Sequence, residues 1–366
     1  MTGQTTKNQH YVPQFLLGGF DIGSGDTSRI NIFDVQRNSL RFDQAVKEVF
    51  SQNYFYDKDN QIEKLLSEQI EGPASEQISK LRNGDFTSLN SGDTRLIKFI
   101  CCQNSRTVEA RQDALNFINA HFGEIVSDLS RLNNLNIKRP KEFRIVPKDK
   151  DSMRSFTAVQ ALSGVIDSKG MEDLRFHLLR NETSKEFVIS DHPVTRYNWL
   201  YRDLKDPRIG SLLAKGVQLF MPLSKDLYLC AYDSKIYKYG SKACDISRVR
   251  DQNDVDWLNQ LQVRSACSFI GFSGRAMQNH VRGLAANFNG KKIYSRESEH
   301  LYQEDIADGN IKTGHMVYTT QMKLLKTPSF VKILKKAKPL VESFQERDPD
   351  VSQALMMLKR RFHKAS

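Results

Sequence analysis

The N-terminal stretch Asn8-Gln9-His10-Tyr11-Val12-Pro13-Gln14-Phe15-Leu16-Leu17-Gly18-Gly19-Phe20 determines the first elements of the fold. Pro13 disfavours helical geometry at the residue before it, and the glycine pair ends any short helix that the proline begins. Residues 29–34 then alternate as a strand does, before a turn at residues 37–39. The sequence therefore predicts a small β-hairpin unit near the N-terminus.

The next part of the chain changes to helical periodicity. From about Asn60 the apolar side chains recur on one helix face, and a second long helix is predicted to begin near Ser91 and to run past Phe117. Another helix is predicted through Ile125 and Leu129. A polar, lysine-rich interval over residues 133–153 is the best candidate for a linker or for an excursion of the chain. A further helical stretch is predicted near residues 153–168.

Strand-like patterns dominate the region after this interval. Four short apolar runs separated by turn residues are predicted to be neighbouring strands of one sheet. The chain then returns to helical spacing over residues 253–268, and residues 273–318 are mixed. The runs are Leu174–Leu179, Glu186–Ser190, Val217–Pro222 and Leu227–Tyr232.

These patterns together predict an α+β fold. An N-terminal β-hairpin and long helices are followed by a small, mainly antiparallel sheet with flanking helices. We divide the chain into an N-terminal region (1–135), a sheet-containing region (150–320) and a basic helical tail (321–366). One continuous domain over residues 1–320 is the alternative.

Composition excludes several classes of protein. With 366 residues, of which 39% are hydrophobic, the chain can bury a full core. Its apolar runs are far shorter than the roughly 20 residues that span a bilayer, and the first residues lack a signal-peptide core. We expect a soluble, cytoplasmic protein. The odd number of cysteines and their spacing favour neither a disulfide framework nor a thiolate zinc site; these are Cys101, Cys102, Cys230, Cys244 and Cys267.

The positive charge is concentrated in the tail. Residues 321–366 hold 11 Lys and Arg against 4 Asp and Glu, which is +7 of the formal net charge of +11. Asp350 is the predicted N-cap of a helix whose last turn is rich in cations. Either the helix docks by one apolar face and is otherwise solvated, or the tail binds phosphate or a partner. The apolar residues are Val351, Leu355, Leu358 and Phe362, and the cations are Lys359, Arg360, Arg361 and Lys364.

Short polar motifs follow the N-terminal stretch in a fixed order. They are Glu63 and Glu68, Gln103-x-x-Arg106-Thr107, Ser190-Asp191-His192-Pro193, Met221-Pro222-Leu223-Ser224 and the Asp256-x-x-Asn259 region. Over roughly residues 8 to 270 the chain thus resembles a broad bacterial family that carries only a domain-of-unknown-function label. His192 departs from that family's pattern, in which asparagine is more typical. The family's place among mobile and defence-associated genes implies a nuclease or toxin-like effector.

The second predicted helix carries two polar residues on its apolar face. At about 100° per residue, Gln103 lies within the stripe and Arg106 at its edge. Each must meet a carboxylate, a carbonyl, water or a ligand phosphate, because an unpartnered buried polar group costs a few kcal/mol. The stripe consists of Leu96, Phe99, Ile100, Thr107, Ala110, Ala114, Phe117 and Ile118.

The preceding helix offers the acidic partners for these residues. Glu63 lies on the flank of the apolar face and is the better candidate to turn inward. Glu68 and Glu71 are predicted to fall toward the opposite, solvated side. Glu63 and Glu68 are also too far apart in angle to share one metal on an ideal helix.

Further candidate residues come from three other segments. Asp191 ends a strand, where it either forms an Asx turn or presents a carboxylate that binds a metal or accepts a proton. His10 is a candidate base, metal ligand or phosphate contact, and equally a histidine bonded to backbone in a turn. Gln14 and Asn259 are candidate substrate-binding residues.

The functional hypothesis gathers these residues at one site. It is a metal-assisted phosphodiester hydrolase acting on nucleic acid or nucleotide, with a divalent Mg²⁺ or Mn²⁺ ion activating water. The catalytic residues would be His10, Glu63, Arg106 and Asp191, with Glu63 and Asp191 also binding metal and with Gln14, Gln103 and Asn259 binding substrate. No P-loop, nucleophile elbow or zinc-ligand motif accompanies them.

The alternative hypothesis is a non-enzymatic interaction or sensor protein. In it the same polar residues form a buried structural network and the basic tail docks a partner. Binding of nucleic acid without cleavage is a third class.

Overall fold

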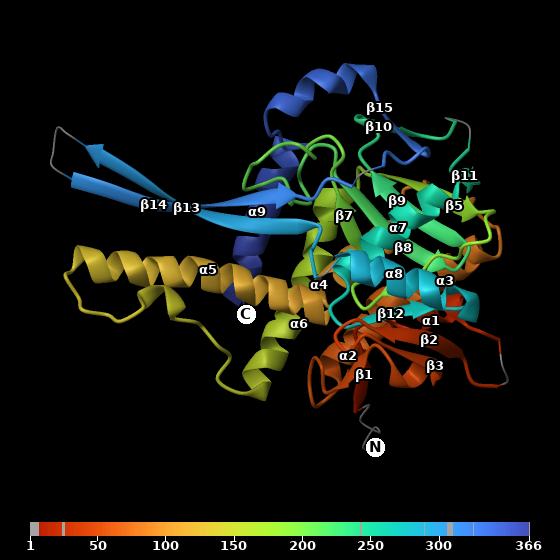
Figure 1. The fold of residues 1–366 in the computed structure, drawn as a ribbon. Helices are drawn as coiled ribbons and strands as arrows, with labels where there is room; N and C mark the ends of the chain where they lie inside the picture. The colour runs from red at the N-terminus through yellow and green to blue at the C-terminus, as the bar shows by residue number, and fades with distance from the viewer. Residues whose placement is uncertain are drawn as a thin grey trace.

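The computed structural model describes residues 7–23, 26–241, 244–288, 290–305, 310–324 and 326–365 (Figure 1). The helices are α1 (Gln14–Leu17), α2 (Gln61–Leu66), α3 (Gly72–Arg82), α4 (Arg95–Ser105), α5 (Val108–Leu132), α6 (Lys150–Asp167), α7 (Gln252–Ser265), α8 (Gln278–Phe288) and α9 (Pro349–Ala365). The strands are β1 (Asn8–His10), β2 (Arg29–Asp34), β3 (Ser39–Ala45), β4 (Ser51–Asn53), β5 (Arg175–Asn181), β6 (Ile189–Ser190), β7 (Thr195–Tyr197), β8 (Gln218–Ser224), β9 (Leu227–Tyr232), β10 (Tyr237–Tyr239), β11 (Ile246–Val249), β12 (Phe269–Phe272), β13 (Tyr294–Asp305), β14 (Asn310–Gln321) and β15 (Val331–Ile333). The predicted α+β class is confirmed.

A five-stranded sheet in the order β11-β5-β9-β8-β7 forms the centre of the molecule. Its pairings are antiparallel except for β11 with β5, so the sheet is mainly antiparallel, as predicted. Because side chains alternate along a strand, Leu229 packs on one face with residues of α3 and α4, and Tyr228 packs on the other with Trp257 of α7. Helices therefore cover both faces.

A second sheet, in the order β3-β2-β12-β6, joins distant parts of the sequence. The predicted N-terminal hairpin is its β2–β3 pair, and β12 lies between that hairpin and β6. The prediction that Glu186–Ser190 lies in the same sheet as the other three runs is wrong. Only Ile189 and Ser190 form a strand, and Asn259 binds the backbone on either side of Phe187, which keeps that segment out of the five-stranded sheet.

The second predicted helix is interrupted. α4 ends at Ser105, and Thr107 begins α5 with its hydroxyl oxygen accepting from the amide of Ala110 at 3.2 Å. The break turns the chain, so the predicted apolar stripe is buried only as far as Thr107. Beyond it, Phe117 is 44% exposed and Ile118 37% exposed. α5 runs on to Leu132 as one helix, which includes the separate helix predicted through Ile125 and Leu129.

α5 and the β13–β14 hairpin extend side by side away from the body of the molecule (Figure 1). Residues 133–149 return along α5, where the Asn119 side chain exchanges hydrogen bonds with the backbone of Ile145. The predicted excursion therefore packs on a helix. Among the described residues, no helix is both long and apolar enough to cross a membrane.

The tail forms α9, as predicted, but its N-cap differs. The Asp348 carboxylate, not that of Asp350, accepts from the amides of Asp350 and Val351. Leu355 is buried whereas Leu358 is 42% exposed, so one narrow face docks against the body. Phe362, Lys359, Arg360, Arg361 and Lys364 have side chains outside the described part of the structure.

Candidate functional site

Arg106 is the centre of a buried polar network. Its side chain is 1% exposed, and its Nη1 donates to Glu71 Oε1 at 2.5 Å. Its Nε donates to Gln103 Oε1 at 2.9 Å, and Gln103 Nε2 donates to the carbonyl of Tyr11 at 2.8 Å. The two polar residues predicted to point inward from α4 thus bind a carboxylate and the N-terminal stretch.

A π-helical turn explains why Glu71 is the partner. In an uninterrupted α-helix Glu71 would lie about 80° round from Glu63, because each residue turns about 100°. Residues Ser67–Glu71 form a π turn instead, which takes up one extra residue and brings this offset to about 20°. The prediction that Glu71 points to the solvated side is therefore wrong. Glu68 does face solvent, with its side chain 56% exposed.

Glu63 lies beside this ion pair without a partner of its own. In the described part of the chain, Glu63 Oε2 and Arg106 Nη2 are buried and make no hydrogen bond. Burial raises the pKa of Glu63 to about 7, the negative charge of Glu71 adds to the rise, and Arg106 opposes it. Glu63 is therefore substantially protonated at neutral pH.

The raised pKa of Glu63 predicts a pH-dependent effect on stability. The folded chain holds this proton more tightly than an unfolded chain, whose glutamate has a pKa near 4.5. The resulting stabilisation is fully present below pH 4.5 and is lost as the pH rises through about 7. Glu63→Gln has nearly the shape of the protonated glutamic acid but cannot ionise. We therefore expect the stability gained over wild type to be larger at pH 8 than at pH 5, by on the order of 2–3 kcal/mol.

Urea unfolding at pH 5 and pH 8 measures this difference. Glu68→Gln is the matched control, because Glu68 lies on the same helical segment but is exposed. A Glu63→Gln effect that is the same at both pH values would contradict the assignment of a buried, protonated Glu63.

His10 also adjoins this network. It is buried, and its Nε2 lies 3.4 Å from the carbonyl oxygen of Val46. Burial lowers the pKa of His10, while Glu71 acts to raise it and Arg106 to lower it. The structure thus brings His10, Glu63, Gln103 and Arg106 together inside the protein.

Asp191 is bound by backbone amides instead. Its Oδ1 accepts from Cys267 at 2.8 Å, and its Oδ2 accepts from Ser268 at 2.7 Å and Phe269 at 3.1 Å. Burial raises the pKa of Asp191 to about 6, although these three hydrogen bonds favour the charged form. The carboxylate ties the end of β6 to the start of β12.

Gln14 and Asn259 do not join the network. Gln14 is exposed at the start of α1. Asn259 is buried on α7, where Oδ1 accepts from the amide of Val188 and Nδ2 donates to the carbonyl of Glu186. Both polar atoms of Asn259 thus hold the segment that leads into β6.

The predicted metal ligands do not fit a metal centre. Asp191 directs its oxygens at amides, and Glu63 has Arg106 and a second carboxylate as neighbours. Nowhere in the described ranges do three or more His, Cys, Asp or Glu side chains form a group that could hold a metal ion. We therefore derive no step through a metal.

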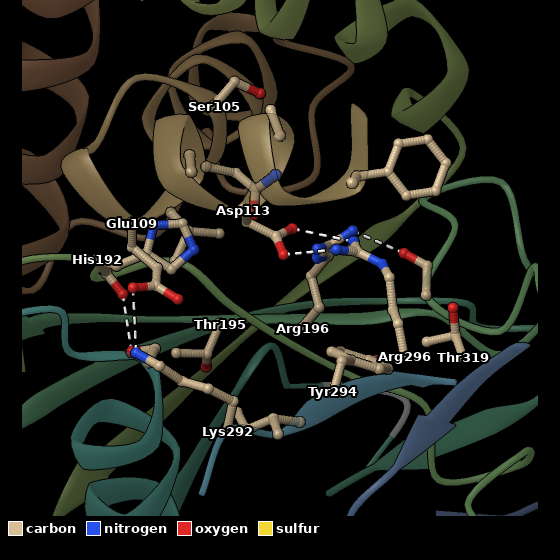
Figure 2. Close-up of a pocket in the computed structure, with 18 of the residues that line it drawn as sticks. Ser105, Glu109, Asp113, His192, Thr195, Arg196, Lys292, Tyr294, Arg296 and Thr319 are labelled. Carbon is tan, nitrogen blue, oxygen red and sulfur yellow. Dashed lines mark hydrogen bonds and ion pairs between the residues drawn. The ribbon is translucent and has the colours of Figure 1, made fainter. Parts of the chain in front are cut away.

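A cavity of about 380 Å³ with charged side chains in its lining lies next to the break between α4 and α5 (Figure 2). Asp113 of α5 faces Arg196 of β7 and Arg296 of β13 across it, and Glu109 of α5 faces Lys292. The lining residues are Asn104, Ser105, Glu109, Ala110, Asp113, Ala114, Phe117, Gln160, His192, Val194, Thr195, Arg196, Pro207, Gly210, Arg264, Ser265, Lys292, Ile293, Tyr294, Arg296 and Thr319.

Cations outnumber carboxylates in this cavity. Lys292 pairs with Glu109 at 3.1 Å, and Arg296 makes two hydrogen bonds to Asp113, at 2.6 and 3.0 Å. Burial acts to raise the pKa of Asp113, but the hydrogen bond and charge of Arg296 outweigh it and lower the pKa. Asp113 is therefore ionised.

Arg196 is the cation without a carboxylate. Its Nη1 donates to the carbonyl of Gly210 at 2.6 Å, and its guanidinium lies 5.6 Å from the centre of the Tyr294 ring. No ion pair joins it to a carboxylate in the part of the chain that the structure describes. Among the described lining residues there are four cations, Arg196, Arg264, Lys292 and Arg296, and two carboxylates, Glu109 and Asp113.

His192 lines the cavity as a neutral ring. Its Nδ1 lies 2.6 Å from Thr107 Oγ1. Burial, together with the smaller effects of the Arg196 and Lys292 charges, lowers the pKa of His192 to about 3. So weak a base accepts a proton poorly near neutral pH. His192 is suited to hydrogen bonding, a role that the amide of asparagine can also fill.

The sequence did not single out the charged residues of this cavity. Arg196 follows Thr195 in a short strand, and Arg296 comes from the stretch that was predicted only as mixed. The sequence signal for these residues was a charged side chain inside an otherwise apolar or β-forming run. That pattern does not predict which distant segments of the chain come into contact.

Comparison with known proteins gives one assignment. A family model described as "Protein of unknown function (DUF4238)" matches residues 8–276. Neither the curated proteins nor the solved structures gave a match.

Proposed function

The chain belongs to the DUF4238 family of proteins of unknown function, and we propose that it binds a phosphate-containing ligand, a nucleotide or nucleic acid, in the cavity beside Arg196. The observation that carries this proposal is that Arg196 forms no ion pair in the described part of the chain, although its charge also acts on the nearby Asp113. A guanidinium in a partly desolvated site binds a phosphate by parallel hydrogen bonds that are about twice as strong as neutral ones.

The size and lining of the cavity support a small-molecule ligand. A volume of about 380 Å³ falls in the range of ordinary ligand sites. The Tyr294 and Phe117 rings offer apolar surface, and Ser105 and Thr195 offer hydroxyl groups. A nucleotide combines these two requirements, since its base is flat and apolar and its phosphates are anionic.

Phosphodiester hydrolysis stays a prediction from the sequence. Cations beside a phosphate stabilise the charge that develops in the transition state. However, His192 is a poor proton acceptor, and the Glu109 and Asp113 carboxylates are each held by a cation. These contacts support binding more directly than they support cleavage, and they favour binding without cleavage over the hydrolase.

One experiment separates the two. The purified chain is incubated with labelled RNA, DNA and nucleotides, with Mg²⁺ or Mn²⁺ and then with EDTA. Binding without product supports a sensor or binding protein, product that EDTA abolishes supports the metal-assisted hydrolase, and neither binding nor product would contradict both.

Replacing Arg196 should remove most of the affinity. We expect Arg196→Gln to weaken nucleotide binding at least about tenfold, because one charge-assisted hydrogen-bonded contact contributes roughly 1.5–3 kcal/mol. Arg196→Lys should retain part of the affinity because it keeps the charge. Calorimetric titration measures both variants.

Lys238→Gln is the control for this substitution. Lys238 is an exposed lysine on β10, away from the cavity. Equal dissociation constants for Arg196→Gln and Lys238→Gln would refute the assignment of the cavity.

A further inference from the structure

A second cavity, of about 450 Å³, lies between the end of β4 and helices α5 and α6. Its lining contains four cations and, among the residues that the structure describes there, no acidic side chain. The lining residues are Lys7, Gln52, Asn53, Tyr54, Phe55, Arg111, Lys150, Met153 and Arg154.

Three of these cations have no carboxylate partner in the described ranges. Arg154 pairs with Asp151, whereas Lys7, Arg111 and Lys150 form no ion pair there. Like charges gathered in one hollow repel one another and are stabilised by an anion that enters it. The charge of this cavity therefore favours a ligand with more than one phosphate group.

Two of the cations are held in place on aromatic rings. The Arg111 guanidinium lies 4.9 Å from the centre of the Phe55 ring and donates to Thr157 Oγ1 at 3.4 Å. Arg154 lies 5.7 Å from the Tyr54 ring, and its Nε donates to the carbonyl of Tyr54 at 2.8 Å. Positions that are fixed in advance reduce the entropy lost on binding.

Tyr54 itself has an unusual backbone conformation. Its φ is 52°, in the left-handed region of backbone conformation that residues other than glycine rarely adopt. The amide of Tyr54 donates to the carbonyl of Lys7 at 2.8 Å, which fixes this conformation. The half-buried ring and the exposed amides of Gln52 and Asn53 line the same cavity.

This cavity is separate from the one beside Arg196. On α5, Asp113 lines the first cavity and Arg111 the second, and two helical positions differ by about 200°. The two cavities thus use opposite faces of the same helix.

We propose that this second cavity binds a nucleoside polyphosphate, with its phosphates on Lys7, Arg111 and Lys150 and its base stacked on Tyr54. Aromatic rings bind bases of any sequence by stacking, and the neighbouring amides can hydrogen-bond a base edge. The site stands independently of the proposed function, which concerns Arg196.

Calorimetric titration with adenosine triphosphate in magnesium-free buffer tests this site. The titration is done in the Arg196→Gln chain, in which we expect the first cavity to bind at least about tenfold more weakly. We expect one equivalent to bind, and the double substitution Lys7→Gln with Lys150→Gln to weaken it at least about tenfold. Both lysines are exposed, so the melting temperature should not change. Lys238→Gln in the same background is the control.

Four outcomes bear on the proposal. No binding to the Arg196→Gln chain, or unchanged binding after the double lysine substitution, would overturn it. Inorganic tripolyphosphate is the comparison ligand, and affinity equal to that of adenosine triphosphate would overturn the role of Tyr54 in holding a base. If Arg196→Gln leaves all binding intact while the lysine substitutions abolish it, the proposed function fails and the second site stands.

Discussion

Arg106→Met is expected to lower the free energy of unfolding by about 3–5 kcal/mol. The guanidinium is 1% exposed and binds Glu71 and Gln103. Its removal leaves the Glu71 carboxylate partly buried beside Glu63 with no cation, and it leaves Gln103 Oε1 without its donor. Chemical unfolding followed by the fluorescence of Trp199 and Trp257 measures the loss.

Two further variants show whether the uncompensated charge causes this loss. Adding Glu71→Gln to Arg106→Met should recover part of the stability, because it removes the unpaired carboxylate. Arg139→Met removes the same side-chain type from an exposed pair with Glu142, where Arg139 is 78% exposed, and should change little. If Arg106→Met lowered the free energy of unfolding no more than Arg139→Met, the contacts of Arg106 would not stabilise packing against the π turn that carries Glu71.

Asp191→Ala is expected to be similarly destabilising, by about 3–5 kcal/mol. Three backbone amides, those of Cys267, Ser268 and Phe269, lose their acceptor at once, and each unsatisfied buried group costs roughly 1–3 kcal/mol. Asp191→Asn should lose less, because one oxygen remains, although its NH₂ group then meets amide donors.

Urea unfolding of both Asp191 variants is compared with Asp226→Ala. Asp226 is exposed in the turn between β8 and β9, where no such cluster depends on it. An Asp191→Ala chain as stable as Asp226→Ala would contradict the role of Asp191 in joining β6 to β12.

The burial of Gln103 and Arg106 could be predicted from the sequence. Helical periodicity predicted that Gln103 of α4 and Arg106, directly after α4, lie on or beside the apolar face, and both are buried. The runs at β5, β8 and β9 were assigned to one sheet because short alternating strands separated by turn residues have a local signature.

The partner of Arg106 could not be predicted in the same way. Angles on an ideal helix point Glu71 to solvent, and only the π turn at Ser67–Glu71 brings it to Arg106. The break at Thr107 has only a weak local signal, because threonine is a preferred N-cap residue but also occurs inside helices. Small departures from ideal helix geometry therefore determine which carboxylate pairs with Arg106.

The cavity beside Arg196 depends on contacts that are distant in sequence. Arg296 reaches Asp113 across 183 positions, and Lys292 reaches Glu109 from the same segment. No pattern within a single helix or strand reveals such a meeting. Gln103, Arg106 and Asp191, which the sequence did single out, are instead buried residues that join separate elements of the fold.

A crystal structure of the chain grown with a bound nucleotide tests the central claim most directly. We predict phosphate oxygens within about 3 Å of the Arg196 guanidinium, inside the cavity between α5, β7 and β13. A structure in which the first cavity is empty of nucleotide, with Arg196 still bound only to the carbonyl of Gly210, would contradict it.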